Sequence, residues 1–129
     1  MLTALRITLD GELQTIRIQD TTLGAQVDDI QKQVGCDTFD VVGLPEDISL
    51  YVDDEGVYRS EPNATLTLVA RAFGFEGVLF GQGVFLGFEP TEGDTLSLTP
   101  AQIERITDAH RAHRHYGRIV LARLQSPTA

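Results

Sequence analysis

Apolar and polar side chains alternate along the amino-terminal part of the chain with the period of a half-buried β-strand. Residues 5–9 carry an apolar side chain at every second position, and residues 16–18 repeat the pattern after Asp-Gly at positions 10–11. Asp-Gly between two alternating segments is a strong signal for a two-residue hairpin turn. Because such a turn pairs Leu5 with Ile16, the pattern predicts that both apolar sets lie on one face.

Two later segments repeat their apolar residues at helical spacing. The first covers residues 23–34, with Thr21 or Thr22 as the N-cap and Gly35 as the stop. The second follows Asn63, which can cap a helix whose inner face lies at positions 66, 69, 70 and 73. The spacing therefore predicts two short helices.

The segment between these helices is typical of strands and turns. Residues 38–44 and 48–52 are rich in strand-forming side chains, and Pro-Glu-Asp at 45–47 predicts the turn that joins them. Asp-Asp-Glu-Gly at 53–56 predicts a further turn, after which residues 57–58 begin a return strand.

A second hairpin is predicted after the second helix. Residues 78–80 and 84–86 are short apolar runs on either side of Gly-Gln-Gly, which is typical of a glycine turn. The polar stretch at 89–94 contains proline and glycine, and this composition predicts a loop.

The last element is a longer helix. Residues 99–102 combine an N-cap threonine, a proline at the first helical position and a capping-box glutamine. Ile103 and Ile106 begin the buried face, residues 119–124 continue it, and Gly117 interrupts it. The sum of these elements is an α+β fold: a mostly antiparallel sheet of β-hairpins with two short helices and a longer C-terminal helix.

Charge is unevenly distributed along the 129 residues, whose formal net charge is −9. Residues 1–98 contain seventeen acids and five bases, whereas residues 99–129 contain two acids and five arginines. We therefore divide the chain into an α+β domain at 1–108 and a basic C-terminal helix extension at 109–129, packed on the same domain or on another copy. The overall acidity makes nucleic-acid binding unlikely, because phosphate neutralisation needs an excess of Lys and Arg.

The sequence also predicts a cytoplasmic protein that does not bind membranes. No apolar run approaches the roughly 18–20 residues that a bilayer requires. The amino terminus alternates like a strand and is unlike a signal peptide. Cys36 is the one cysteine and forms no internal disulfide, which is typical of a reducing cytosol.

Several motifs occur in a fixed order between residues 16 and 106. They are an apolar helix ending in Val-Gly at 34–35, Leu-Tyr-Val-Asp-Asp-Glu-Gly at 50–56, Pro-Asn at 62–63, and Leu-Thr-x-x-Gln-Ile-Glu-Arg-Ile at 98–106. This stretch resembles an uncharacterised domain family of phages and mobile elements, a domain of unknown function found near antirestriction genes. Cys36 stands where the family has a second glycine. The resemblance implies a phage, prophage or conjugative-element origin and transfers no catalytic residues.

An acidic run without any base lies between Lys32 and Arg59. If the predicted strands are neighbours, its carboxylates project from nearby turns and attract a basic partner. We predict that this face binds a host protein with a basic surface, in the strongest form as a DNA mimic; a solubility surface is the alternative. The predicted partner-binding residues are Asp37, Asp40, Glu46, Asp47, Asp53, Asp54 and Glu55.

The C-terminal helix is a second candidate surface. A basic tail complements an acidic body, so a self-assembling accessory or structural factor is the alternative function. Contact of this helix with nucleic acid is the weaker option because of the acidic body. The residues predicted for self-association or partner contact are Arg111, Arg114, Arg118, Ile119 and Leu121.

No catalytic residue, metal or cofactor is predicted. His110, His113 and His115 form the densest group of potential ligands, but a zinc site normally requires four, so a solvated helix face is favoured. Cys36 follows a helix C-terminus, where a thiol pKa rises, whereas activation requires a lowered pKa. A small enzyme or metal-binding protein is the second alternative.

Overall fold

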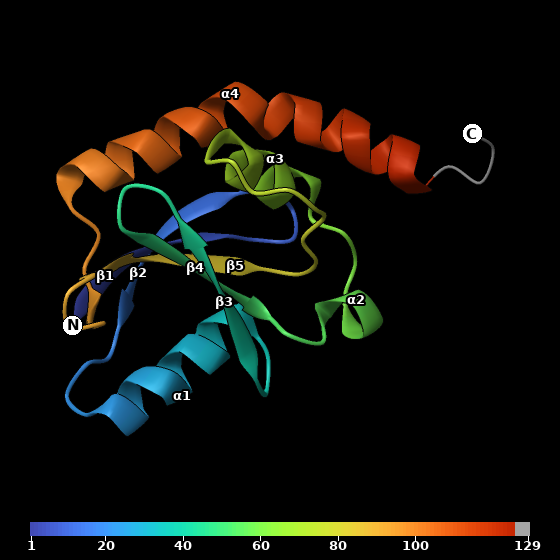
Figure 1. The fold of residues 1–129 in the computed structure, drawn as a ribbon. Coiled ribbons are helices and arrows are strands. Elements are labelled where there is room, and N and C mark those ends of the chain that lie inside the picture. Colours follow the sequence, from blue (N-terminus) through green and yellow to red (C-terminus); the bar gives the residue numbers. More distant parts are fainter. Residues whose placement is uncertain (126–129) are drawn as a thin grey trace.

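A six-stranded antiparallel sheet forms the centre of the protein, with the strand order β2-β1-β5-β4-β3 and with β6 paired to β5 (Figure 1). The computed structural model describes the backbone of residues 1–125 and the side chains of residues 1–114. The strands are β1 (Leu2–Ile7), β2 (Leu13–Ile18), β3 (Phe39–Leu44), β4 (Ile48–Asp53), β5 (Gly83–Phe88) and β6 (Thr95–Leu96). The helices are α1 (Leu23–Val34), α2 (Gly56–Arg59), α3 (Ala64–Ala72) and α4 (Pro100–Gln125). The predicted α+β fold class is confirmed.

Helices cover both faces of the sheet, so the fold has three layers (Figure 1). On one face α1 packs over a core that includes Ile30 and Tyr51. On the other face α3 and α4 pack over a core that includes Leu50, Phe85 and Ile106. Because β4 and β5 are buried on both faces, their sequences are nearly continuous apolar runs and do not alternate with polar residues.

The amino-terminal hairpin forms as predicted, but the predicted register is wrong. Leu5 lies opposite Thr15, not opposite Ile16. The turn contains one more residue than expected, because Gly11 has a φ of 84° and its N–H donates to the Thr8 carbonyl at 2.9 Å. This extra residue shifts the pairing by one position, so Leu5 packs beneath α3 and α4 while Ile16 packs on the α1 side.

The two short helices have the caps that the sequence predicts. Thr22 Oγ1 accepts a hydrogen bond from Ala25 N at 3.0 Å, and Gly35 ends α1 in the left-handed conformation. Asn63 Oδ1 accepts from Leu66 N at 3.0 Å at the start of α3. The predicted inner face of α3 is buried in the core.

The β3–β4 hairpin is also confirmed, with Leu44 opposite Ile48 across the turn at 45–47. Two non-glycine residues of this turn, Glu46 and Asp47, have positive φ values of 66° and 59°. Asp is one of the residue types that adopt this conformation more readily, since its short side chain can bond locally to the backbone.

Two predicted strands do not form. Residues 57–58 belong to the single-turn helix α2 and do not begin a return strand. The apolar run at 78–80 forms only an isolated bridge between Phe80 and Pro62. Gly81, between this bridge and β5, has a φ of 76°, a conformation that glycine adopts without steric cost. Strand β5 pairs with β1 and β4 in the centre of the sheet.

Helix α4 begins with the predicted capping box. Thr99 Oγ1 accepts from Gln102 N at 3.1 Å, and Gln102 Oε1 accepts from Thr99 N at 2.8 Å. The helix continues through Gly117 to Gln125, so the predicted interruption is wrong. One glycine costs a helix only about 1 kcal/mol, which is too little to end a long one.

The predicted boundary between residues 108 and 109 falls inside α4. Ala109 and His110, immediately after it, are both buried. In the part of the chain that the structure describes, no helix combines the length and the apolar character that membrane crossing requires.

Candidate functional site

The acidic residues predicted as one face divide into two groups at opposite ends of the β3–β4 hairpin. Glu46 and Asp47 lie in the turn between the strands, whereas Asp37, Asp53 and the residues that follow Asp53 lie at the other end. A strand of six residues is about 17 Å long at roughly 3.4 Å per residue. The structure therefore separates the predicted face into two sites that are considered in turn.

The turn end of the hairpin is engaged by the start of α4. Arg105 Nη2 donates to Glu46 Oε2 at 3.0 Å, and this bond raises the pKa of Arg105 above its ordinary value. Gln102 Nε2 donates to the carbonyls of Glu46 and Asp47 at 2.9 and 3.1 Å. The Arg105 guanidinium also lies 5.1 Å from the centroid of the Phe73 ring. These contacts fix α4 to the turn, so Glu46 serves the fold at this position.

The other end of the hairpin is held by local hydrogen bonds of its own acids. Thr38 Oγ1 donates to Asp54 Oδ1 at 2.6 Å, across the start of β3 and the end of β4. Asp53 Oδ1 accepts from Glu55 N at 2.9 Å, which shapes the turn into α2. These two bonds fix the carboxylates of Asp53 and Asp54 at this end of the hairpin.

One cation lies among these acids. Arg59 Nη1 is 3.4 Å from Asp37 Oδ2 and 3.9 Å from Glu55 Oε2. All three side chains are exposed, so these ion pairs are screened by solvent and contribute little to stability. Four acids against one arginine leave this end of the hairpin strongly negative.

Apolar side chains are exposed directly beside this acidic end. The exposed fraction is 88% for Tyr58, 57% for Val57 and 41% for Val78. Val57 and Val78 border a hollow of about 280 Å³ whose wall includes Asp53 and Asp54, and Tyr58 is the next residue after Val57 in α2. We name this region the α2 surface; it comprises Asp53, Asp54, Glu55, Val57, Tyr58 and Val78.

The sequence placed the acids of the α2 surface correctly in a turn but missed its apolar part. Val57 and Tyr58 are two adjacent strand-forming residues, and the sequence predicted that they begin a strand. In the structure both lie in the four-residue helix α2 and are exposed. The available signal was the run of three acids before residue 56, because negative charge favours a helix start.

Asp40 lies on β3, opposite Val52 of β4, and is exposed. Directly opposite residues point to the same face of a sheet, so Asp40 lies on the α3 and α4 side, next to the Val52 wall of the hollow. Its Oδ1 accepts from Val41 N at 3.0 Å.

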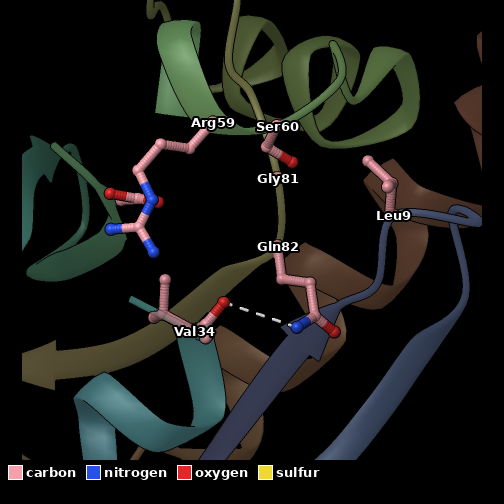
Figure 2. Close-up of a pocket in the computed structure, with 8 residues that line it drawn as sticks. Leu9, Val34, Arg59, Ser60, Gly81 and Gln82 are labelled. Atoms are coloured by element: carbon pink, nitrogen blue, oxygen red, sulfur yellow. Dashed lines mark hydrogen bonds between the residues drawn. The ribbon is translucent and has the colours of Figure 1, made fainter. Parts of the chain in front are cut away.

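A second hollow of about 220 Å³ lies between the end of α2, the end of α1 and the segment before β5 (Figure 2). Arg59, the last residue of α2, and Ser60, which follows it, line this hollow together with Gln82 from the segment before β5. Gln82 Nε2 donates to the Val34 carbonyl at 3.4 Å, so this amide connects the end of α1 to β5. Asp53 lines both hollows.

Cys36 is half-buried near the same acids. Burial, together with the nearby negative charges of Asp53 and Asp54, raises the pKa of the Cys36 thiol to about 11. The thiolate is the nucleophilic form, and at neutral pH it is therefore scarce. The predicted weakness of this cysteine as a nucleophile agrees with its surroundings.

Two of the histidines of α4, His110 and His113, have described side chains. His110 is buried, and its Nε2 lies 2.7 Å from the Gly11 carbonyl oxygen. His113 is half-buried. Among the residues with described side chains, no three potential ligands form a metal-binding group.

The predicted helix surface is only partly described. Arg111 forms an ion pair with Asp108 at 3.1 Å, and Arg114 borders a hollow with Asp10 and Glu12. His115, Arg118, Ile119 and Leu121 lie outside the residues whose side chains the structure describes.

Fold and surface together define an α+β domain with an open antiparallel sheet, helices on both faces, and one acidic and apolar end. The chain belongs to the family described as Domain of unknown function (DUF3846), whose sequence model matches residues 2–111. This confirms the resemblance to an uncharacterised domain family and extends it in both directions. Comparison with curated proteins and with solved structures gave no significant match.

Proposed function

We propose that this protein is a small non-enzymatic interaction protein of a phage or mobile element, acting in the host cytoplasm. Its α2 surface binds a host protein that carries a basic surface. The observation that carries the proposal is the position of an 88% exposed tyrosine and two exposed valines beside a row of carboxylates. The phage origin and the host-modulating, antirestriction-like role extend what the sequence resemblance implies.

The two chemical components of the α2 surface support different parts of binding. Carboxylates that are not neutralised attract a basic protein and accelerate its association. Aromatic side chains supply most of the affinity where they become buried, and tyrosine is enriched among such residues. Tyr58 lies in α2 between Val57 and Arg59, and the Arg59 side chain pairs with Asp37.

The surroundings of Cys36 and His110 support the proposal that the protein binds a partner without catalysing a reaction. The raised pKa of Cys36 makes it a poor nucleophile at neutral pH. The buried His110 is engaged with the Gly11 carbonyl.

The test compares two double variants with the same change in charge. Capture from a host lysate identifies the binding protein, and titration of that purified protein then measures affinity for each variant. We expect Asp53→Lys with Asp54→Lys to weaken binding about tenfold or more, while Asp28→Lys with Glu92→Lys, on α1 and in the β5–β6 loop, changes it less than about twofold. Equal losses would show that net charge alone matters, and an unaffected first variant would contradict the proposal.

A further variant tests whether the exposed Tyr58 ring takes part in binding. Tyr58→Ala removes the exposed ring without changing charge, and we expect it to weaken binding with the fold unchanged.

If the partner binds DNA, duplex DNA should compete with this protein for the partner. Absence of competition would remove the DNA-mimic form and leave the interaction itself intact.

Self-association through α4 is the alternative proposal. Helix α4 extends past the rest of the protein in Figure 1. Deletion of residues 115–129 keeps the buried Ala109 and His110. If α4 makes the contacts, this truncation abolishes an oligomer seen by light scattering; if the α2 surface makes them, host-protein binding is unchanged.

A further inference from the structure

Strand β3 is an open edge of the sheet. It is the last strand in the sheet order, and among residues 1–125 it pairs only with β4. Outside β3, Asp54 N donates to the Thr38 carbonyl at 3.3 Å, which makes residues 38 and 54 a hydrogen-bonded pair. Because such pairs alternate along an antiparallel ladder, Phe39, Val41 and Gly43 direct their backbone N–H and C=O groups away from β4.

The outward position of Val41 is seen directly. Its N–H donates to the side chain of Asp40 at 3.0 Å, where a further strand would supply a backbone carbonyl. The Val41 side chain is 47% exposed. A backbone carbonyl of an added strand can therefore take the place of the Asp40 carboxylate at the Val41 N–H. The Asp40 carboxylate is then free to pair with a basic side chain of the added strand.

Charge selects the kind of segment that fits this edge. Asp40 lies on the strand itself, Asp53 and Asp54 lie at one end of the hairpin, and no base occurs between Lys32 and Arg59. A second copy of this chain would bring the same negative charges together, which disfavours self-pairing. A basic segment gains from the same field.

The opposite edge of the sheet provides a comparison. Within the described backbone, strand β2 also has only one neighbour, β1, but its residues 13–18 contain Arg17 and no acid. Both edges are open, and they differ in the charge of the strand itself: β3 carries Asp40, whereas the acids nearest to β2 in sequence, Glu12 and Asp20, lie outside the strand.

We propose that β3 accepts an extended basic segment of a protein partner as an added antiparallel or parallel strand. Basic side chains at alternate positions lie next to Asp40, and apolar side chains at the positions between them lie next to Val41, because neighbouring residues of a strand point to opposite faces. This mode of recognition rests on the proposed function, since it takes the partner to be basic.

The experiment uses a capped heptapeptide of alternating Lys and Val as the probe and measures its binding to the full chain by calorimetry at low salt. Val41→Pro removes the outward N–H at a strand position where proline is tolerated, because that N–H is not part of the β3–β4 ladder. We expect Val41→Pro to weaken binding about tenfold, and Val41→Thr, which keeps the N–H, to bind like the unaltered protein.

Thr15→Pro is the matched control. Residue 15 is exposed on β2 and lies at an outward position of the other edge, because the Thr8 N–H bond to the Glu12 carbonyl sets the alternation there. This variant should bind the peptide like the unaltered protein. Equal binding by Val41→Pro and the unaltered protein would overturn strand addition, as would failure of the unaltered protein to bind.

A second measurement leaves the protein unchanged, in case Val41→Pro does not fold. The peptide is N-methylated at every second amide in two versions, one at the Lys positions and one at the Val positions. An added strand uses one of these two sets, so one version should lose binding and the other should keep it. Equal affinity of both versions would contradict the proposal.

The outcomes also separate strand addition from the proposed function. If Asp53→Lys with Asp54→Lys removes host-protein binding while Val41→Pro leaves peptide binding intact, the acidic α2 surface stands and strand addition fails. If Val41→Pro removes peptide binding while the charge reversal leaves host-protein binding unchanged, strand addition stands and the proposed function fails.

Discussion

The side-chain amide of Asn63 donates to the backbone carbonyl of Thr8 at 2.9 Å, which joins two residues 55 positions apart in the chain. The same Nδ2 donates to the Gly81 carbonyl at 2.9 Å, and Oδ1 caps α3 through Leu66 N. Asn63 is 1% exposed. One buried side chain therefore fastens the first hairpin, the start of α3 and the entry to β5.

We expect Asn63→Ala to lower the free energy of unfolding by about 2–4 kcal/mol, because it removes a cap and leaves two buried carbonyls without their donor. Asn63→Asp keeps the cap, but it loses both donations and places a buried carboxylate against the two carbonyl oxygens, so it should destabilise at least as much as Asn63→Ala. Thr22→Ala removes the exposed cap of α1 and should cost about 1 kcal/mol. Urea unfolding measures all three, and equal losses for Asn63→Ala and Thr22→Ala would contradict this role.

Cap residues could be predicted from the sequence because capping is local chemistry. Thr22, Asn63 and the pair Thr99 and Gln102 each bond to a backbone N–H within three residues. The additional donation from Asn63 to Thr8 could not be predicted, since it depends on how distant segments pack.

Strand pairing and the candidate surface depended on longer-range packing. Asp-Gly at 10–11 correctly predicted a turn, but the sequence did not distinguish two loop residues from three, and that difference moved Ile16 to the other face. The position of β5 between β1 and β4 joins strands far apart in sequence, so neighbouring apolar runs were paired instead. The acidic run could be identified from the sequence alone. Its separation into two groups could not, because this depends on which end of the β3–β4 hairpin each acid occupies.

Substitution by alanine should destabilise the protein to different extents at two glycines that have similar φ angles. Gly11 has a φ of 84°, and a Cβ there would lie 2.7 Å from Thr65 Oγ1. Gly93 has a φ of 78°, and a Cβ there would meet no atom within 4 Å. Both substitutions introduce about 1 kcal/mol or more of backbone strain, but only Gly11→Ala adds a clash.

We therefore expect Gly11→Ala to lower the free energy of unfolding by about 1–3 kcal/mol more than Gly93→Ala does. Thermal or urea unfolding of both variants measures the difference. Equal destabilisation would show that the hairpin loop moves freely away from α3, in conflict with the contact to Thr65.

Cys36 should react slowly in the native protein. With the thiol pKa raised to about 11 from 9.0, the thiolate at pH 8 is scarcer than in the unfolded chain by roughly a hundredfold. Iodoacetamide labelling of the native protein, compared with the same protein in concentrated urea, measures this ratio. Equal rates in the two states would contradict the raised pKa.

The same pKa predicts a dependence of stability on pH. Because the native thiol has the higher pKa, its contribution to stability is fully present below pH 9, the unfolded value, and is lost as pH rises toward about 11. We expect Cys36→Ser to lose less stability than the unaltered protein between pH 9 and 11. Parallel stability curves for the two proteins across this interval would rule out this contribution.

The α2 surface leads to a kinetic prediction, because its two kinds of side chain act at different stages of binding. Exposed carboxylates steer a basic protein before contact, so Asp53→Lys with Asp54→Lys should mainly lower the association rate constant and reduce its dependence on salt. The Tyr58 ring is 88% exposed in the free protein. It can contribute only once it is covered, so Tyr58→Ala should mainly raise the dissociation rate constant.

Surface plasmon resonance with the purified host protein, repeated at several salt concentrations, separates the two rate constants for each variant. Asp28→Lys with Glu92→Lys carries the same change in charge away from the α2 surface and should leave the dissociation rate unaltered. If Tyr58→Ala changed neither rate constant while the charge reversal changed the association rate, the carboxylates would act by long-range attraction alone. The contact surface would then lie elsewhere, and the open β3 edge, whose acids belong to the same field, would be the first place to examine.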